Sequence, residues 1–142
     1  KNFSMITAFD VIEHVDDIDK FINQVNKCLL DNGYFVFSTI FIDSLPAKLL
    51  GSYWPWIIPM HLSYFDKKNI QFYLKKNNFS VISISNHVHY AKINYAITGL
   101  LYKLPSFFNF IGRLITIIIP NKISIPFNLS DTKIIIAKKL NE

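Results

Sequence analysis

The chain has 142 residues and a mass of 16.5 kDa, which suits one domain or a large part of one and argues against two independent domains. Hydrophobic residues make up 51% and charged residues 18%, so the chain can bury a packed core, which excludes an intrinsically disordered polypeptide. Fifteen Lys and Arg against 10 Asp and Glu give a net charge of +5. The cations are scattered along the chain, so nucleic-acid binding is permitted but not favoured.

A single cysteine, Cys28, excludes an internal disulfide and a cysteine-rich zinc site, and it favours a reducing, cytoplasmic setting. The first residue is Lys1, and the chain opens with no basic and apolar leader, so we expect a piece of a longer protein. Charged residues and a proline interrupt the apolar stretch from 93 to 120. This stretch therefore lacks the run of ~20 apolar residues that a membrane-spanning helix needs.

The N-terminal part predicts a strand, a helix and a second strand. Residues 3–8 are apolar and uncharged, as expected of a buried parallel strand. Apolar residues then recur at helical spacing, with Asp16 or Asp17 as the N-cap and a C-terminal stop at 32–33. Residues 34–40 form the second buried strand. The two strands are expected to be parallel, with a right-handed crossover between them.

A long aromatic loop and another helix and strand follow. The loop at 41–65 contains several prolines and both tryptophans, and it leaves room for one short helix at 44–50. Asp66 is expected to cap a second helix, which ends at 77–78 and leads into a strand at 79–85. Long loops at the carboxyl ends of strands are where functional sites usually lie.

The last third of the chain predicts an apolar insert and a final strand. Residues 91–120 are expected to form two helices that are split at Pro105, and residues 133–137 form the strand. Simple packing in the core is the favoured explanation of the insert, and the alternatives are a lid, a dimer face or a helix pair on a membrane surface.

Four segments stand in a recognisable order. They are Phe9-Asp-Val-Ile-Glu-His-Val-Asp16 after the first strand, Leu29-Leu-Asp-Asn-Gly33, Trp54-Pro-Trp56, and Pro59-Met-His-Leu-Ser-Tyr-Phe65 before the capped helix. This order resembles the C-terminal half of class I S-adenosylmethionine-dependent methyltransferases. The resemblance is closest to the methyltransferase-domain group around the ubiquinone-biosynthesis O-methyltransferases. It covers residues 1–85, and the closing strand is similar to the family's last, antiparallel strand.

The resemblance implies an α/β, Rossmann-like sheet that is truncated at its N-terminus. Residues 1–142 would be the C-terminal part of a single methyltransferase domain, with strands four to seven of seven and the insert at 91–120 before the last strand. The four glycines form no Gly-x-Gly-x-Gly loop, so the expected cofactor, S-adenosylmethionine, should not bind strongly to this chain alone. The part of the cofactor site that is implied here lies at Ala8, Phe9 and Asp10.

The resemblance also implies candidate catalytic and acceptor-binding residues. His61 is the candidate base that removes a proton from a hydroxyl acceptor. His14 is the second candidate catalytic residue, and its structural alternative is packing at the mouth of the cofactor site. The acceptor pocket is expected to involve Trp54, Trp56 and Tyr64. The alternatives are structural: His61 bonds a loop carbonyl, and the aromatic residues hold the loop down.

A metal site is the less favoured alternative. The spacing of Asp10, Glu13 and His14, with His61 from the next loop, offers oxygen and nitrogen ligands for a divalent ion. This set resembles the metal-binding arrangement of small-RNA 3′-terminal 2′-O-methyltransferases.

The predicted function is therefore methyl transfer within a longer chain, with oxygen as the acceptor atom and a small or lipid-linked acceptor. A cytoplasmic enzyme is expected, with peripheral membrane contact through 91–120 as an option. Two alternatives remain: a non-catalytic scaffold or membrane-associated binding module with the same fold, and the metal-dependent RNA enzyme.

Overall fold

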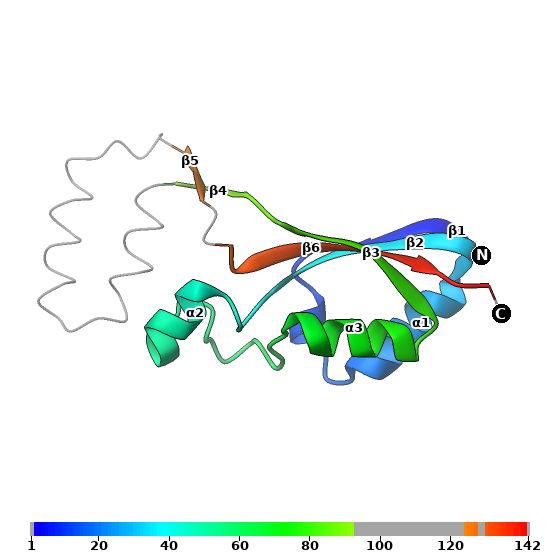
Figure 1. The fold of residues 1–142 in the computed structure, drawn as a ribbon, viewed down its shortest axis with the longest axis horizontal. Helices are drawn as coiled ribbons and strands as arrows, with labels where there is room; N and C mark the ends of the chain where they lie inside the picture. The colour runs from blue at the N-terminus through cyan, green and yellow to red at the C-terminus, as the bar shows by residue number, and fades with distance from the viewer. Residues whose placement is uncertain (1, 93–123, 128–129, 142) are drawn as a thin grey trace, which may run out of the picture.

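A computed structural model describes residues 2–92, 124–127 and 130–141 of the chain. The main sheet has four strands, in the order β1 (Phe3–Ala8), β2 (Leu29–Ile40), β6 (Thr132–Lys139) and β3 (Phe79–Asn86). β1 and β2 are parallel, whereas β6 runs antiparallel to both of its neighbours, β2 and β3. Figure 1 shows helices α1 (Ile18–Cys28) and α3 (Lys67–Lys76) on the same face of this sheet. The predicted α/β class and the parallel pairing of the first two strands are confirmed.

Shorter elements complete the described part of the chain. They are η1 (Ile12–His14), α2 (Leu45–Leu50), η2 (Gly51–Tyr53) and the paired strands β4 (His89–Lys92) and β5 (Ser124–Phe127). The predicted insert at 91–120 lies outside the described residues from 93 onward, and its first two residues belong to β4. Among the helices in the described ranges, none has both the length and the hydropathy to cross a membrane.

Helix α1 begins where the sequence predicts and ends earlier. Asp17 is its N-cap, because the Asp17 carboxylate accepts a hydrogen bond from the Lys20 N–H. Ile22 and Val25 face the core, whereas Cys28 at the end of the helix is exposed. Ile18 and Phe21 pack partly buried against the same core, so Cys28 is the residue of α1 that departs from the predicted apolar face.

The predicted helix stop at 32–33 is wrong, because these residues lie inside β2. Leu29 already has an extended backbone and begins the strand, so β2 is longer than the predicted strand at 34–40. Asn32 has a φ of 60° at the point where the register between β1 and β2 is irregular. Asparagine tolerates this left-handed conformation in a strand irregularity as well as after a helix, so the Asn-Gly pair does not distinguish the two.

β1 is not the buried strand that the sequence predicts. Within the described residues it pairs only with β2, and Phe3 and Met5 are each about half exposed, at 52% and 54%. Ile6 and Ala8 are partly buried against the core. Hydropathy reports what a strand is able to bury, but the burial that results depends on the elements packed beside it.

The core lies between the sheet and the two long helices. Phe35 and Phe37 of β2 stack with their ring centroids 4.5 Å apart and are fully buried. Ile135 of β6, Ile22 of α1 and Leu74 of α3 belong to the same buried cluster. This packing fixes the helices against the sheet and leaves the loops at the carboxyl ends of β1 and β2 to form a site.

The short helix predicted after β2 and the predicted cap at Asp66 are confirmed. Ser44 accepts a hydrogen bond from the backbone of α2, which is the short helix predicted at 44–50. Asp66 and Asn69 form a reciprocal capping box at the start of α3, and Asn77 is its C-cap. Asn78 then adopts a φ of 61°, which turns the chain into β3.

Replacement of Phe37 by alanine should strongly destabilise the fold. The ring is fully buried, so Phe37→Ala is expected to lower the free energy of unfolding by about 3–5 kcal/mol. Urea denaturation of wild type and variant measures this change. Phe72→Ala is the matched control, because that ring is 63% exposed, and its expected effect is within about 0.5 kcal/mol. Equal losses for the two variants would contradict the core described above.

Candidate active site

The candidate site lies where β1 and β2 end. Ala8 pairs with Phe37 in the parallel register, so both strands lead into loops at the same edge of the sheet. Residues after β1 form η1, and residues after β2 form the aromatic loop at 41–65. The loop returns to η1, because the N–H groups of Leu62 and Ser63 both donate to the Glu13 backbone carbonyl, at 2.8 and 3.2 Å.

Asp10 is held by β2 immediately after β1 ends. Its backbone N–H donates to Ser38 Oγ at 2.9 Å, and the Ser38 hydroxyl donates to Asp10 Oδ1 at 2.7 Å. Asp10 also has a φ of 53°, a conformation that is unusual for a residue other than glycine. The chain turns sharply here, next to Phe9, whose side chain is 51% exposed.

Glu13 places a carboxyl group inside the protein, because the residue is only 2% exposed. Thr39 Oγ1 donates a hydrogen bond to Glu13 Oε2 at 3.1 Å. Burial disfavours the charged carboxylate and raises the pKa of Glu13, although the hydrogen bonds to it act in the opposite direction. Such a group can hold a proton, or it can release the proton when a cation is nearby.

His14 and His61 meet edge to face, with ring centroids 4.8 Å apart. His14 Nδ1 lies 2.8 Å from the Met60 carbonyl oxygen, and His61 Nδ1 lies 2.7 Å from the Trp56 carbonyl oxygen. A carbonyl oxygen only accepts, so each Nδ1 carries a hydrogen and each neutral ring keeps its lone pair on Nε2. Both imidazoles are therefore fixed with Nε2 as an acceptor of protons or a ligand for metal.

The structure brings three of the four candidate metal ligands together. One ligand atom each from Glu13, His14 and His61 lie within 4.8 Å of one another. Asp10 is not in this group, because its carboxylate is bonded to Ser38. The predicted joint cluster with Asp10 is therefore not formed, since the turn after β1 directs that side chain to β2.

The predicted aromatic residues divide into a buried anchor and residues close to His61. Trp54 is fully buried against Ile40, and its indole N–H donates to Asp131 Oδ2 at 3.0 Å. Trp56 and Tyr64 are partly buried. Their ring centroids lie 6.3 and 6.2 Å from the ring centroid of His61. In this conformation Trp54 holds the loop down, whereas Trp56 and Tyr64 surround His61.

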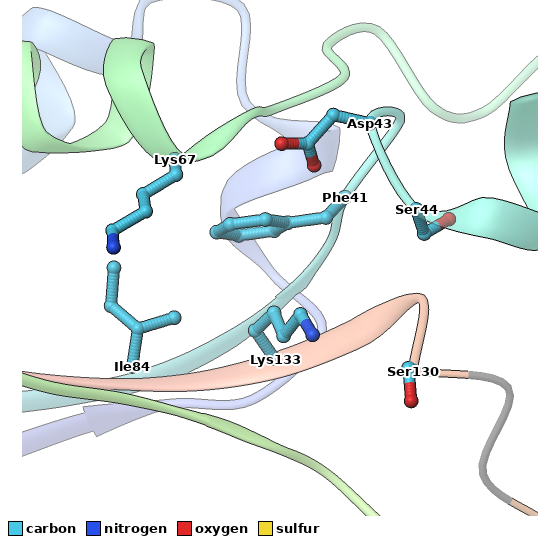
Figure 2. Close-up of a pocket in the computed structure, with 7 residues that line it drawn as sticks. All are labelled: Phe41, Asp43, Ser44, Lys67, Ile84, Ser130 and Lys133. Carbon is cyan, nitrogen blue, oxygen red and sulfur yellow. The ribbon is translucent and has the colours of Figure 1, made fainter.

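A separate hollow of about 310 Å³ is formed by other residues. Figure 2 shows the residues that line it. It is lined by Phe41, Asp43, Ser44, Lys67, Ile84, Ser130 and Lys133. The ring of Phe41 lies in the middle of the view, and Lys133 donates a hydrogen bond to Asn86 Oδ1. None of the predicted site residues lines this hollow.

Sequence reasoning missed three residues that organise the site: Ser38, Thr39 and Asp131. Ser38 and Thr39 are polar residues in an otherwise apolar strand, and both are buried. A buried hydroxyl needs a partner, so their position in the strand was a usable signal. Asp131 lies far along the chain, directly before β6, and no local pattern connects it to the loop.

The chain matches a known family of proteins. The sequence model of the family described as methyltransferase domain matches residues 1–84. A comparison with curated proteins gives no match.

Solved structures share the fold at low sequence identity. The YcgJ protein from Bacillus subtilis is 14% identical with a TM-score of 0.57, and the match covers 99% of this chain and 65% of that one. Magnesium protoporphyrin IX methyltransferase from Synechocystis, solved with bound S-adenosylhomocysteine, is 11% identical with a TM-score of 0.53, over 97% and 45% of the two chains. A phosphoethanolamine N-methyltransferase from Haemonchus contortus was also solved with S-adenosylhomocysteine. It is 14% identical with a TM-score of 0.51, and the match covers 98% of this chain and 34% of that one. The chain thus spans less than two thirds of each structure, and the likeness establishes a Rossmann-like methyltransferase fold.

Replacement of Glu13 by glutamine should stabilise the protein, and more so as the pH rises. The pKa of Glu13 is raised above 4.5 in the folded state, so the folded state binds this proton more tightly than the unfolded state. Stability from this group is complete below the unfolded pKa and is lost as the pH rises through the folded pKa. A glutamine cannot become charged, so Glu13→Gln avoids that loss.

Melting temperatures measured from about pH 4 to 8 in the presence of a chelator test this expectation. The advantage of Glu13→Gln over wild type should grow with pH and then level off. Asp16→Asn is the control, because Asp16 is exposed on the nearby surface. An advantage that is the same at every pH would contradict the assigned shift.

Proposed function

Because the chain belongs to the methyltransferase-domain family, we propose that it is the C-terminal part of an S-adenosylmethionine-dependent O-methyltransferase of the ubiquinone-biosynthesis type. The observation that carries the proposal is the fixed orientation of His61, whose Nδ1–H is held by a backbone carbonyl so that Nε2 is available as a base. The acceptor is proposed to be small or lipid-linked. The match to only part of each longer solved structure supports a domain that extends beyond this chain.

The residues at the end of β1 suit one part of the cofactor. Phe9 offers a half-exposed ring, and Asp10 is held in a sharp turn beside Ala8 at the carboxyl edge of the parallel strands. The sequence contains four glycines and no Gly-x-Gly-x-Gly loop. The remainder of the cofactor site is therefore proposed to come from residues outside this chain.

In the proposed reaction the cofactor would provide the methyl group and His61 would remove the proton of the acceptor. When bound, S-adenosylmethionine would supply an electrophilic methyl group for transfer to the acceptor oxygen, with S-adenosylhomocysteine as the leaving group. His61 Nε2 takes the proton of the acceptor hydroxyl, and Nδ1–H stabilises the resulting imidazolium by its bond to the Trp56 carbonyl. His14 packs edge to face against His61 and restricts its ring orientation.

The surroundings of His61 support an apolar acceptor. Met60 and Leu62 flank it in the chain and are 63% and 54% exposed, while Trp56 and Tyr64 lie beside its ring. These side chains offer apolar contact to a lipid chain or an aromatic ring. The cytoplasmic setting and the peripheral membrane contact through 91–120 that the sequence predicts belong to the same proposal.

Substitution of His61 should abolish most methyl transfer and leave cofactor binding intact. In the full-length protein, His61→Gln is expected to lower kcat by about 10²- to 10⁴-fold, because the acceptor proton loses its base. Transfer of a radiolabelled methyl group to a panel of phenolic and sugar hydroxyls measures kcat, and calorimetry with S-adenosylhomocysteine measures binding.

His87→Gln is the matched control, because His87 lies after β3 and outside the candidate site. Methyl transfer that survives His61→Gln unchanged would overturn the assignment of the base. Binding of S-adenosylhomocysteine without transfer to any acceptor would instead favour the non-catalytic scaffold.

A second candidate function uses Glu13, His14 and His61 as ligands of a divalent metal ion. The specific observation in its favour is that both histidines donate Nδ1–H to carbonyl oxygens, which is the usual support for a histidine that binds metal through Nε2. The ligand atoms also converge within 4.8 Å. The function that follows is a metal-dependent methylation of a hydroxyl, with an RNA 2′-hydroxyl as the alternative acceptor.

Metal binding separates the two candidates, because one Nε2 cannot be both a free base and a ligand. For the metal enzyme, calorimetry with Mn²⁺ or Zn²⁺ should show one site that is lost in Glu13→Gln and kept in His87→Gln. A chelator should then remove activity, and an RNA with a terminal 2′-deoxy residue should not be methylated. Methyl transfer that is insensitive to the chelator would contradict this candidate.

A further inference from the structure

We infer that Asp131 is a positioning residue for His61 and acts through Trp56. The inference deepens the proposed function and rests on it for the catalytic consequence, although the contacts themselves do not depend on the reaction. Asp131 stands directly before β6 and is 75 residues further along the chain than Trp56. It therefore connects the last strand of the sheet to the loop that carries the candidate base.

The Asp131 side chain gathers two indole groups on one oxygen atom. Asp131 Oδ2 accepts hydrogen bonds from Trp54 Nε1 at 3.0 Å and from Trp56 Nε1 at 2.9 Å. The residue is only 3% exposed, and its backbone carbonyl accepts the Phe41 N–H at 2.6 Å, where β2 ends. A buried carboxylate without donors is unstable, so these bonds tie the loop firmly to the sheet.

Trp56 links Asp131 to His61 through hydrogen bonds at its indole and at its backbone carbonyl. Its backbone carbonyl accepts from His61 Nδ1 at 2.7 Å and from the Tyr64 hydroxyl at 3.3 Å. The same residue is thus fixed at its indole by Asp131 and presents its carbonyl to His61. Because the indole and the carbonyl belong to one residue, we expect loss of the Asp131 bond to loosen the backbone that carries this carbonyl.

Trp54 and Trp56 differ in how far packing alone holds them. Trp54 is fully buried in a cluster with Ile40 and Ala47, whereas Trp56 is partly buried at the edge of that cluster. The bond to Asp131 therefore matters most for Trp56. Without it, the carbonyl that selects the Nδ1–H form of His61 is displaced, and the proton is shared between the two ring nitrogens.

The test compares Asp131→Ala and Asp131→Asn in the full-length protein, with Thr132→Val as the matched control. Thr132 is the next residue and is equally buried, but its hydroxyl has no hydrogen-bond partner among the described residues. Nitrogen NMR of histidine-labelled protein reports which ring nitrogen of His61 carries the hydrogen. A merely structural role for Asp131 would lower stability without changing this signature in the folded protein.

We expect Asp131→Ala to convert the His61 signals from the Nδ1–H pattern to an averaged pattern. kcat should fall by about 10- to 100-fold, with the KM for S-adenosylmethionine unchanged. Asp131→Asn should restore most of both properties, because an amide oxygen can accept the same two indole N–H groups. Thr132→Val should match wild type in both measurements.

Trp56→Phe is a second variant that keeps the proposal testable if Asp131→Ala does not fold. This variant keeps an aromatic ring and the Asp131 bond to Trp54, but it removes the indole N–H that Asp131 holds. It should show the same change in the His61 signals. An unchanged Nδ1–H pattern in folded Trp56→Phe or Asp131→Ala would overturn the proposal.

The NMR readout also separates this inference from the proposed reaction. If His61 loses its Nδ1–H pattern as expected but wild type transfers no methyl group, the positioning role stands and the proposed function fails.

Discussion

The parallel pairing of β1 with β2 is the constraint on which the rest of the structure depends. It brings the carboxyl ends of two strands to one edge of the sheet, so η1 and the loop at 41–65 are built side by side. The backbone carbonyl of Glu13 then accepts hydrogen bonds from the N–H groups of Leu62 and Ser63. These bonds hold the loop against η1. His14 and His61, which are far apart in sequence, meet because of this closure.

Burial of polar groups gives the site its order. Glu13 and Thr39 lie within the protein and bond to each other, so neither is left without a partner in a poorly solvating environment. The two histidines use backbone carbonyls for their Nδ1–H groups, which leaves Nε2 of each ring for chemistry. A base for methyl transfer and a ligand for a divalent ion need this same preparation, which is why one arrangement supports both candidate functions.

The antiparallel strand β6 links the site to the end of the chain. It lies between β2 and β3, and this position places Asp131 next to the aromatic loop. One carboxylate oxygen then fixes two indole groups and, through Trp56, the carbonyl that orients His61. A residue that does not touch His61 is therefore proposed to influence the position of its ring through the backbone of the loop.

The sequence by itself determined the local elements: the order of the first strands and helices, the short helix at 44–50, the caps at Asp17 and Asp66, and the segments that contain Glu13 and His61. These features depend on spacing and on contacts within a few residues, which a linear pattern records. Only the tertiary structure decided that β1 is partly exposed and that Asp131 holds the tryptophans. It also decided that Asp10 bonds to Ser38 and is therefore not part of the metal-ligand group. Each of these depends on contacts between distant parts of the chain, and hydropathy and spacing do not specify which distant residues become neighbours.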